Sequence, residues 1–305
     1  MDELQAPPPI GRFEALLNEG GFIVTAEFRP PTTASANFLL EKAEPIASRV
    51  NAVNVTDGAG ARVHTSSLAV AALLVREGYE PILQVTCRDS NRIALEGHLL
   101  GGGALGIRNI LCMRGDHPSD GDHPDAKGVF DLETLELIGM AATLRDKGTL
   151  LSGRQVDHPP HYVIGAVDTP VWPNADWSAA NLLRKVDAGA RFVQTQFCYD
   201  PAIVEAYARA LRAAGLTEQV RLLIGLGPIG SARSALWMRE HLYGVDVPDT
   251  VIDRLGNAAD PAAEGRRICV ELMERFRDLD GVNGVHLMAV RDELEIVRVL
   301  EEAGY

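Results

Sequence analysis

Glu27 is the residue of this chain whose type and surroundings most clearly suggest chemistry. It interrupts the apolar run 23–28, which reads Ile-Val-Thr-Ala-Glu-Phe. A carboxyl group among apolar side chains is costly unless it is paired or protonated, and burial raises its pKa. Such a group suits a general acid near neutral pH. A structural ion pair with Arg29 or Arg114 would explain Glu27 equally well.

Asp116 and two glutamines are further polar candidates at the ends of apolar runs. Asp116 follows Arg114 and Gly115, where glycine permits a close backbone approach to a ligand. An aspartate there can accept hydrogen bonds from a heterocyclic ring or cap a turn. Strand alternation predicts that Gln194 and Gln196 share one face. A bound amide-rich ring or a buried hydrogen-bond network would satisfy both amides equally well.

Two other patterns invite a ligand but favour plainer interpretations. The loop 117–125 contains His and Asp, without any spacing typical of a metal site, so we expect a solvated loop and no metal. Gly225, Gly227 and Gly230 form GxGxxG, yet a dinucleotide half-domain needs more strands than follow. We therefore predict a tight turn after a strand. We expect His64 to be an ordinary surface or helix residue, and His286 to be a hydrogen-bonded core histidine.

Eight short apolar runs alternate with segments of helical pattern, which predicts a parallel α/β fold. Most runs are continuous rather than alternating, as in strands buried on both faces. Eight such units in 305 residues favour a (βα)8 TIM barrel in a single domain, 1–305, with 1–10 as a loose N-terminal arm. The strands are expected at 22–28, 52–56, 82–87, 109–113, 162–167, 192–197, 221–226 and 284–288. The helices are expected at 35–48, 63–77, 90–105, 132–146, 178–188, 201–214, 232–241, 261–278 and 293–302.

Composition narrows the function classes. The formal net charge is −13, which argues against nucleic-acid binding. Hydrophobic residues make up 46 %, enough for a large core, but no apolar run approaches the roughly 20 residues of a membrane span. The four cysteines form no CxxC pair, so we expect buried, reduced thiols in a cytoplasmic protein. In barrels the reacting groups come from the carboxyl ends of the strands, where Glu27, Asp116 and Gln196 are predicted.

Five stretches, taken together, resemble the methylenetetrahydrofolate reductase family. They are 25–31 (TAEFRPP), 54–62 (NVTDGAGAR), 104–116 (ALGIRNILCMRGD), 185–200 (KVDAGARFVQTQFCYD) and 284–290 (GVHLMAV). The stretch 86–111 is similar to the branch found in one-carbon catabolic pathways and in fused methyltransferase–reductases. The resemblance implies an FAD-binding barrel in which NADH or NADPH reduces the flavin. The flavin then converts 5,10-methylenetetrahydrofolate to 5-methyltetrahydrofolate.

The resemblance also assigns roles to residues. Glu27 matches the proton donor, Asp116 the carboxylate near flavin and pterin, and Gln196 the amide that contacts folate and nicotinamide. Further folate contacts are implied for Asp116, Ser234 and Arg291. Cofactor contacts are implied for Thr56, Asp57, Ala59, Gln84, Arg114, Gly115, Asp116, Val129, Asp168, Trp172, Asn181, Arg184 and Lys185.

Several positions depart from the family pattern, mainly at cofactor contacts. Asp57 stands where many members have Tyr, and Gln84 where many have His. Trp172 lies near another family His, while Ser178 and Ser234 replace an Asp and a Gln. FMN in place of FAD, and direct hydride transfer from NADH without flavin, therefore stay open. So does a folate-binding subunit active only in a larger complex. Family members are commonly oligomeric, so we expect a homo-oligomer; the preferred nicotinamide cofactor and the direction of reaction stay open.

Overall fold

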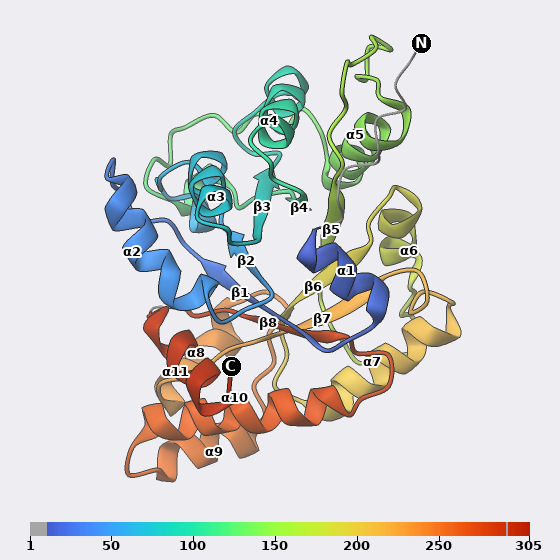
Figure 1. The fold of residues 1–305 in the computed structure, drawn as a ribbon. Coiled ribbons are helices and arrows are strands. Elements are labelled where there is room, and N and C mark those ends of the chain that lie inside the picture. Colours follow the sequence, from blue (N-terminus) through green and yellow to red (C-terminus); the bar gives the residue numbers. More distant parts are fainter. Residues whose placement is uncertain (1–10, 291) are drawn as a thin grey trace.

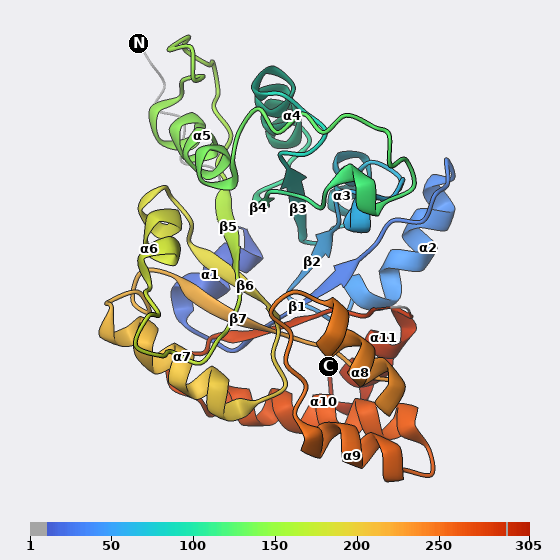
Figure 2. The same cartoon turned by 180° about the vertical axis from the view of Figure 1, so that it is seen from behind.

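Eight parallel strands close into a barrel in chain order, so the predicted α/β (βα)8 TIM fold is confirmed (Figures 1 and 2). The computed structural model describes residues 11–290 and 292–305. The expected loose arm at 1–10 and the site residue Arg291 lie outside the described residues. The strands are β1 Ile23–Phe28, β2 Ala52–Val55, β3 Pro81–Thr86, β4 Asn109–Met113, β5 Val163–Asp168, β6 Phe192–Phe197, β7 Arg221–Leu226 and β8 Gly284–Leu287.

Helices surround the barrel, and the nine predicted helical segments each contain one. Two more helices, α1 and α9, were missed by the sequence analysis. Among the described residues, no helix is both long and apolar enough to cross a membrane. The helices are α1 Arg12–Glu19, α2 Ala36–Ala47, α3 Ser67–Arg76, α4 Arg92–Ala104, α5 Thr134–Lys147, α6 Ala180–Asp187, α7 Pro201–Ala213, α8 Ala232–His241, α9 Asp249–Asn257, α10 Pro261–Arg277 and α11 Leu294–Glu302, with short 3-10 turns η1 Ala59–Ala61 and η2 Pro118–Asp120.

Helix α1 closes the amino-terminal end of the barrel, over which it lies in Figure 1. Its Phe13 and Leu17 pack against the first inward side chains of the strands, including Ile23 and Phe192. The rings of Phe13 and Phe192 meet edge to face with centroids 5.1 Å apart. Gly165 makes room for this contact, because a Cβ there would overlap the Phe192 ring. Apolar packing thus fills this end of the barrel.

A polar layer lies above this apolar plug, inside the barrel. Gln194 donates to Thr25 Oγ1 and Asn54 Oδ1, each at 3.0 Å, and Asn54 donates to Gln194 Oε1 at 2.5 Å. Thr25 Oγ1 lies 3.0 Å from His286 Nδ1. His286 is thus the hydrogen-bonded core histidine that was expected, and burial lowers its pKa to about 3. This buried hydrogen-bond network lies inside the barrel, between the apolar packing at its amino-terminal end and its open, carboxyl end.

The glycine pattern lies at the carboxyl end of β7, as predicted, but Gly225 is inside the strand and residues 227–231 form an irregular connection rather than the predicted tight turn. Cβ atoms at Gly225 and Gly227 would overlap the backbone carbonyls of Thr195 and Met288, respectively. Glycine therefore lets the end of β7 approach its neighbours closely.

The prediction of buried thiols is confirmed within the structure, because all four cysteines are buried and free.

Candidate active site

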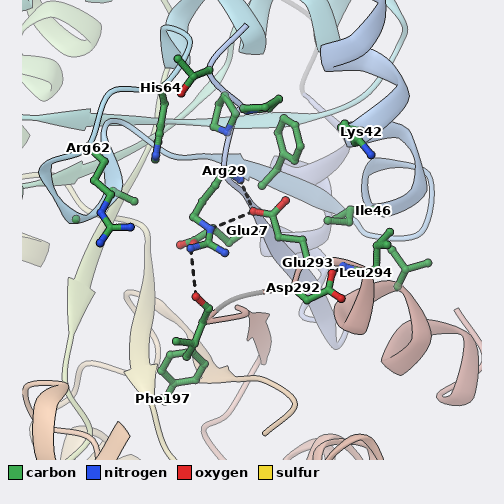
Figure 3. A pocket seen from close by; sticks show the side chains of 18 of the residues that line it. Glu27, Arg29, Lys42, Ile46, Arg62, His64, Phe197, Asp292, Glu293 and Leu294 are labelled. Atoms are coloured by element: carbon green, nitrogen blue, oxygen red, sulfur yellow. Dashed lines mark hydrogen bonds and ion pairs between the residues drawn. The ribbon is translucent and has the colours of Figure 1, made fainter. Parts of the chain in front are cut away.

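A cavity of about 780 Å³ opens at the carboxyl end of the strands, and Glu27 lies in its wall (Figure 3). The end of β1, the segment after β2, and the segment between β8 and α11 form most of this wall. Its volume falls within the range of small-molecule sites. Besides Glu27, the wall includes Arg29, His64, Arg62 and Glu293. The cavity therefore brings ionisable groups from three separate parts of the chain together.

Burial raises the pKa of Glu27 to about 7. The nearby Arg29 guanidinium lowers that pKa, whereas the negative charges of Glu293 and Asp116 raise it. The ion pair expected with Arg114 as one explanation of Glu27 is not formed, because Arg114 pairs with Glu133 at 3.4 Å. Glu27 is therefore a carboxyl group that can hold and release a proton near neutral pH.

Asp116 is exposed after β4, and its carboxylate is fixed in place by the backbone of another loop. Its Oδ2 accepts a hydrogen bond of 2.8 Å from Gly60 N. Gly115 precedes it with φ +84°, and a Cβ there would lie 3.0 Å from Thr86 Cβ. Because Gly60 lines the main cavity and donates to Asp116, the Asp116 carboxylate lies at the rim of that cavity.

Thr56 and Gln84 present unpaired polar atoms on neighbouring strands. The pairing of Val55 with Leu83 places Thr56 beside Gln84 when the register continues. Thr56 Oγ1 is buried without a hydrogen-bond partner, and Gln84 is 5 % exposed. Among the described residues, the Gln84 side chain forms no hydrogen bond either. An unpaired buried hydroxyl such as that of Thr56 is costly, so a ligand that bonds to it would be favoured, and the Gln84 amide beside it could bond to the same ligand.

Asp57 accepts several hydrogen bonds from its neighbours. Its Oδ2 accepts from Thr86 N at 3.0 Å and from Thr86 Oγ1 at 2.8 Å. Its Oδ1 accepts from Ser67 Oγ at 3.3 Å. The buried Arg88 donates to Gly58 O at 2.9 Å. These bonds fasten the end of β2 to β3 and α3, and they hold the following loop.

Gln194 and Gln196 have different surroundings in the structure. Gln194 is buried in the polar layer. A register shift against β7 lies between Gln194 and Phe197. The Gln196 side chain turns back, and its Oε1 accepts from Phe197 N at 3.0 Å. A bulge between the two residues interrupts the regular alternation on which the prediction of one shared face depends.

The candidates on β5 and α6 are mostly bound to the protein itself. Asp168 accepts a hydrogen bond of 2.5 Å from Tyr207, and Lys185 Nζ donates to Val167 O at 2.6 Å. Burial lowers the pKa of Lys185. The remaining candidates lie at or near the surface: Trp172 is 58 % and Val129 43 % exposed, and Arg184 donates to Asn181 Oδ1 at 3.3 Å.

A second cavity of about 460 Å³ adjoins the first at the ends of β7 and β8. The two share Trp237, Val290 and Asp292 as walls. Ser234 lines the second cavity, and Ala59 lines the first. The two cavities are therefore neighbours at the open end of the barrel.

The sequence analysis missed three residues of this site. His64 is not an ordinary surface or helix residue: it lines the main cavity from a loop, and its Nδ1 is buried without a partner. Burial lowers its pKa. Arg29 was considered only as a partner of Glu27, and Glu293 only as the start of a helix. No motif or periodicity marks these residues, because loop geometry brings them together. Within residues 11–290 and 292–305, no cluster of three His, Cys, Asp or Glu could hold a metal.

Comparison with known proteins identifies relatives along nearly the whole chain. The family model described as methylenetetrahydrofolate reductase matches residues 12–304. A Caenorhabditis elegans protein named probable methylenetetrahydrofolate reductase (NADPH) is 26 % identical, over 96 % of this chain and 44 % of its own length. A Pectobacterium carotovorum protein named 5,10-methylenetetrahydrofolate reductase is 27 % identical, over 88 % of this chain and 85 % of its own. The chain thus spans less than half of the first relative and most of the second.

Solved structures share the fold at low sequence identity. An uncharacterised Clostridium thermocellum protein, described as binding two copies of 5-methyl-5,6,7,8-tetrahydrofolic acid, superposes with a TM-score of 0.61. It is 15 % identical over 94 % of this chain and 95 % of its own. EDTA monooxygenase from Chelativorans reaches a TM-score of 0.52 at 12 % identity, covering 93 % of this chain and 94 % of its own. At these identities the likeness concerns the fold alone.

Proposed function

The chain belongs to the methylenetetrahydrofolate reductase family, and we propose that it interconverts 5,10-methylenetetrahydrofolate and 5-methyltetrahydrofolate with NAD(P)H as hydride source. The observation that carries this proposal is Glu27, whose burial in the cavity wall raises its pKa to about 7. Opening the one-carbon bridge of the substrate requires a proton at N10. A carboxylic acid that keeps its proton near neutral pH suits that step.

The proposed roles follow from where the side chains lie. Glu27 gives its proton to N10, and the bridge opens to a 5-iminium cation. The carboxylate of Asp116 lies at the same rim and favours this cation by its charge. Hydride then reaches the iminium carbon to give the 5-methyl group. Gln196, at the bulge of β6, is proposed to contact the substrate through its amide.

The residues present fit the ring of a flavin, and FAD is therefore our proposed cofactor. Thr56 and Gln84 offer unpaired polar atoms at adjacent positions inside the barrel mouth. Asn181 and the exposed Arg184 on α6 are available for a ribose and a phosphate. A flavin bound there would accept hydride from NAD(P)H and pass it to the folate. The protein itself supplies binding, orientation and the proton.

A reductase that transfers hydride from NADH directly to the folate is the second candidate. Three observations favour it. The carboxylate of Asp57 is occupied by Thr86 and Ser67, and that of Asp168 by Tyr207. The ammonium group of Lys185 points to a barrel carbonyl. These groups would have to break internal bonds to hold FAD. FMN, which lacks the adenylate half of FAD, needs fewer of these contacts.

Each of these proposals can be tested. The absorbance spectrum of the purified protein, with and without added FAD, reports flavin binding, and full activity without any flavin band would contradict the FAD mechanism. Glu27→Gln should lower folate turnover by roughly 10²- to 10⁴-fold, the usual contribution of a general acid. Reduction of bound flavin by NAD(P)H should remain near the wild-type rate. An equal loss in both half-reactions would make Glu27 structural.

Full activity of the isolated chain would exclude a subunit that works only in a complex, and light scattering would test the proposed homo-oligomer.

A further inference from the structure

Arg29 lies between two carboxyl groups of the main cavity, Glu27 and Glu293 (Figure 3). Glu293 directly precedes α11, and its Oε1 accepts hydrogen bonds from Arg29 N at 2.8 Å and Arg29 Nε at 3.2 Å. The Arg29 and Glu293 side chains are 29 % and 22 % exposed. A backbone and a side-chain donor therefore hold one carboxylate oxygen in a partly buried, fixed position.

Charge balance at the cavity wall depends on this pair. An arginine beside an otherwise unneutralised carboxyl group would favour the ionised form of Glu27 and weaken it as an acid. Because Glu293 accepts from Arg29 at two points, its negative charge offsets part of the positive charge of Arg29 that acts on Glu27. Burial raises the pKa of Glu293 as well, whereas its bonds with Arg29 lower it and so favour the charged form of the pair. Burial can then dominate the protonation of Glu27, as its raised pKa indicates.

Other ionisable groups near Glu27 do not replace this effect. Asp116, after β4, adds negative charge and favours the protonated form. His64, after β2, has its pKa lowered by burial and is neutral at neutral pH, as is His286 on β8. Arg62 lines the same cavity but is not among the charges that act on Glu27 most strongly. Arg29 is the cation that lowers the pKa of Glu27.

We propose that Glu293 is a positioning residue that neutralises Arg29 and so keeps Glu27 protonated and available as the acid. The role of Glu27 as proton donor rests on the proposed function, whereas its protonation does not. The segment between β8 and α11 thus sets the working pH of a group on β1. The geometry assigns this role to a side chain that takes no part in the reaction itself.

Glu293→Gln tests the proposal, because the amide oxygen can still accept from Arg29 while the charge is lost. The readout is the infrared carbonyl band of the protonated Glu27 carboxyl group in the full chain, assigned by its absence in Glu27→Gln. We expect the titration midpoint of this band to fall by roughly 1 to 3 pH units, the usual effect of a nearby opposite charge. Arg29→Gln should move the midpoint in the opposite direction.

Asp292→Asn is the matched control, since Asp292 lines the same cavity, its Oδ1 accepts from Leu294 N, and it is not among the charges that shift the pKa of Glu27. It should leave the midpoint near that of the wild type. An unchanged midpoint in Glu293→Gln, or an equal fall in Asp292→Asn, would overturn the proposal. The pH profile of folate turnover separates this result from the proposed function. If the infrared midpoint moves and the profile does not follow, Glu293 sets the protonation of Glu27 but Glu27 is not the proton donor.

Discussion

The raised pKa of Glu27 predicts that this residue costs the protein stability above neutral pH. Below pH 4.5, the ordinary pKa, the carboxyl group is protonated in both folded and unfolded chains. Between 4.5 and about 7 the unfolded chain loses the proton while the folded chain keeps it. The unfolded state therefore binds fewer protons, and the free energy of unfolding falls as pH rises through this window.

The size of the effect follows from the two pKa values. The difference between 4.5 and about 7 corresponds to about 3 kcal/mol, at about 1.36 kcal/mol for each pH unit. Solvent in the open cavity screens part of this cost, so we expect about 2 to 3 kcal/mol. Glu27→Gln removes the titrating group and keeps its shape. The variant should match the wild type near pH 4.5 and exceed it by this amount at pH 8.

Urea unfolding at both pH values measures the prediction. Glu77→Gln is a suitable control, because Glu77 is exposed at the end of α3 and should show no such pH dependence. If Glu27→Gln and the wild type differ equally at pH 4.5 and pH 8, the folded protein does not hold a proton on Glu27. That result would contradict both the stability prediction and the proposed role of Glu27 as a general acid.

Three further outcomes can be measured, two of them inside the barrel. Gly165→Ala should destabilise the protein by about 1 to 3 kcal/mol, because its Cβ would overlap the Phe192 ring; Gly139→Ala, in α5 with open space around it, should instead stabilise by roughly 0.5 to 1 kcal/mol in the same unfolding assay. His286 should remain neutral from pH 8 down to pH 5, since burial lowers its pKa to about 3; ¹⁵N NMR of its ring would contradict this by a titration near 6.5.

The strands could be predicted because each is an apolar run whose burial is encoded locally. Helix α1 could not, because its eight residues are stabilised by partners that lie far away in sequence. Phe13 packs on Phe192 in β6, and no pattern near residue 13 indicates that contact. Helix α9 is similarly short. Local periodicity thus predicts elements that carry their own apolar pattern, and it misses those defined by a distant surface.

The site residues also divide into those that the local sequence indicates and those that it does not. Glu27 could be predicted because a carboxyl group inside an apolar run is unusual by itself. His64 could not, because its loop is shaped by contacts with the segment after β4. Gly60 N donates to Asp116, and Val63 N donates to Asp122 Oδ2 at 2.9 Å. The conformation of the loop after β2 therefore depends on carboxylates of the segment after β4. The sequence of neither segment indicates this pairing.

The separation of Gln194 from Gln196 shows how a neighbouring strand can decide the environment of a side chain. Thr195 Oγ1 accepts from Gly225 N at 2.8 Å, within the register shift between β6 and β7. A Cβ at Gly225 would overlap the carbonyl oxygen of Thr195 and crowd that of Gln196. The bulge therefore requires glycine on β7, some thirty residues later in the chain. Gln194 remains in the buried layer, whereas Gln196 bonds to Phe197 N beside a bulge that depends on a residue outside their own strand.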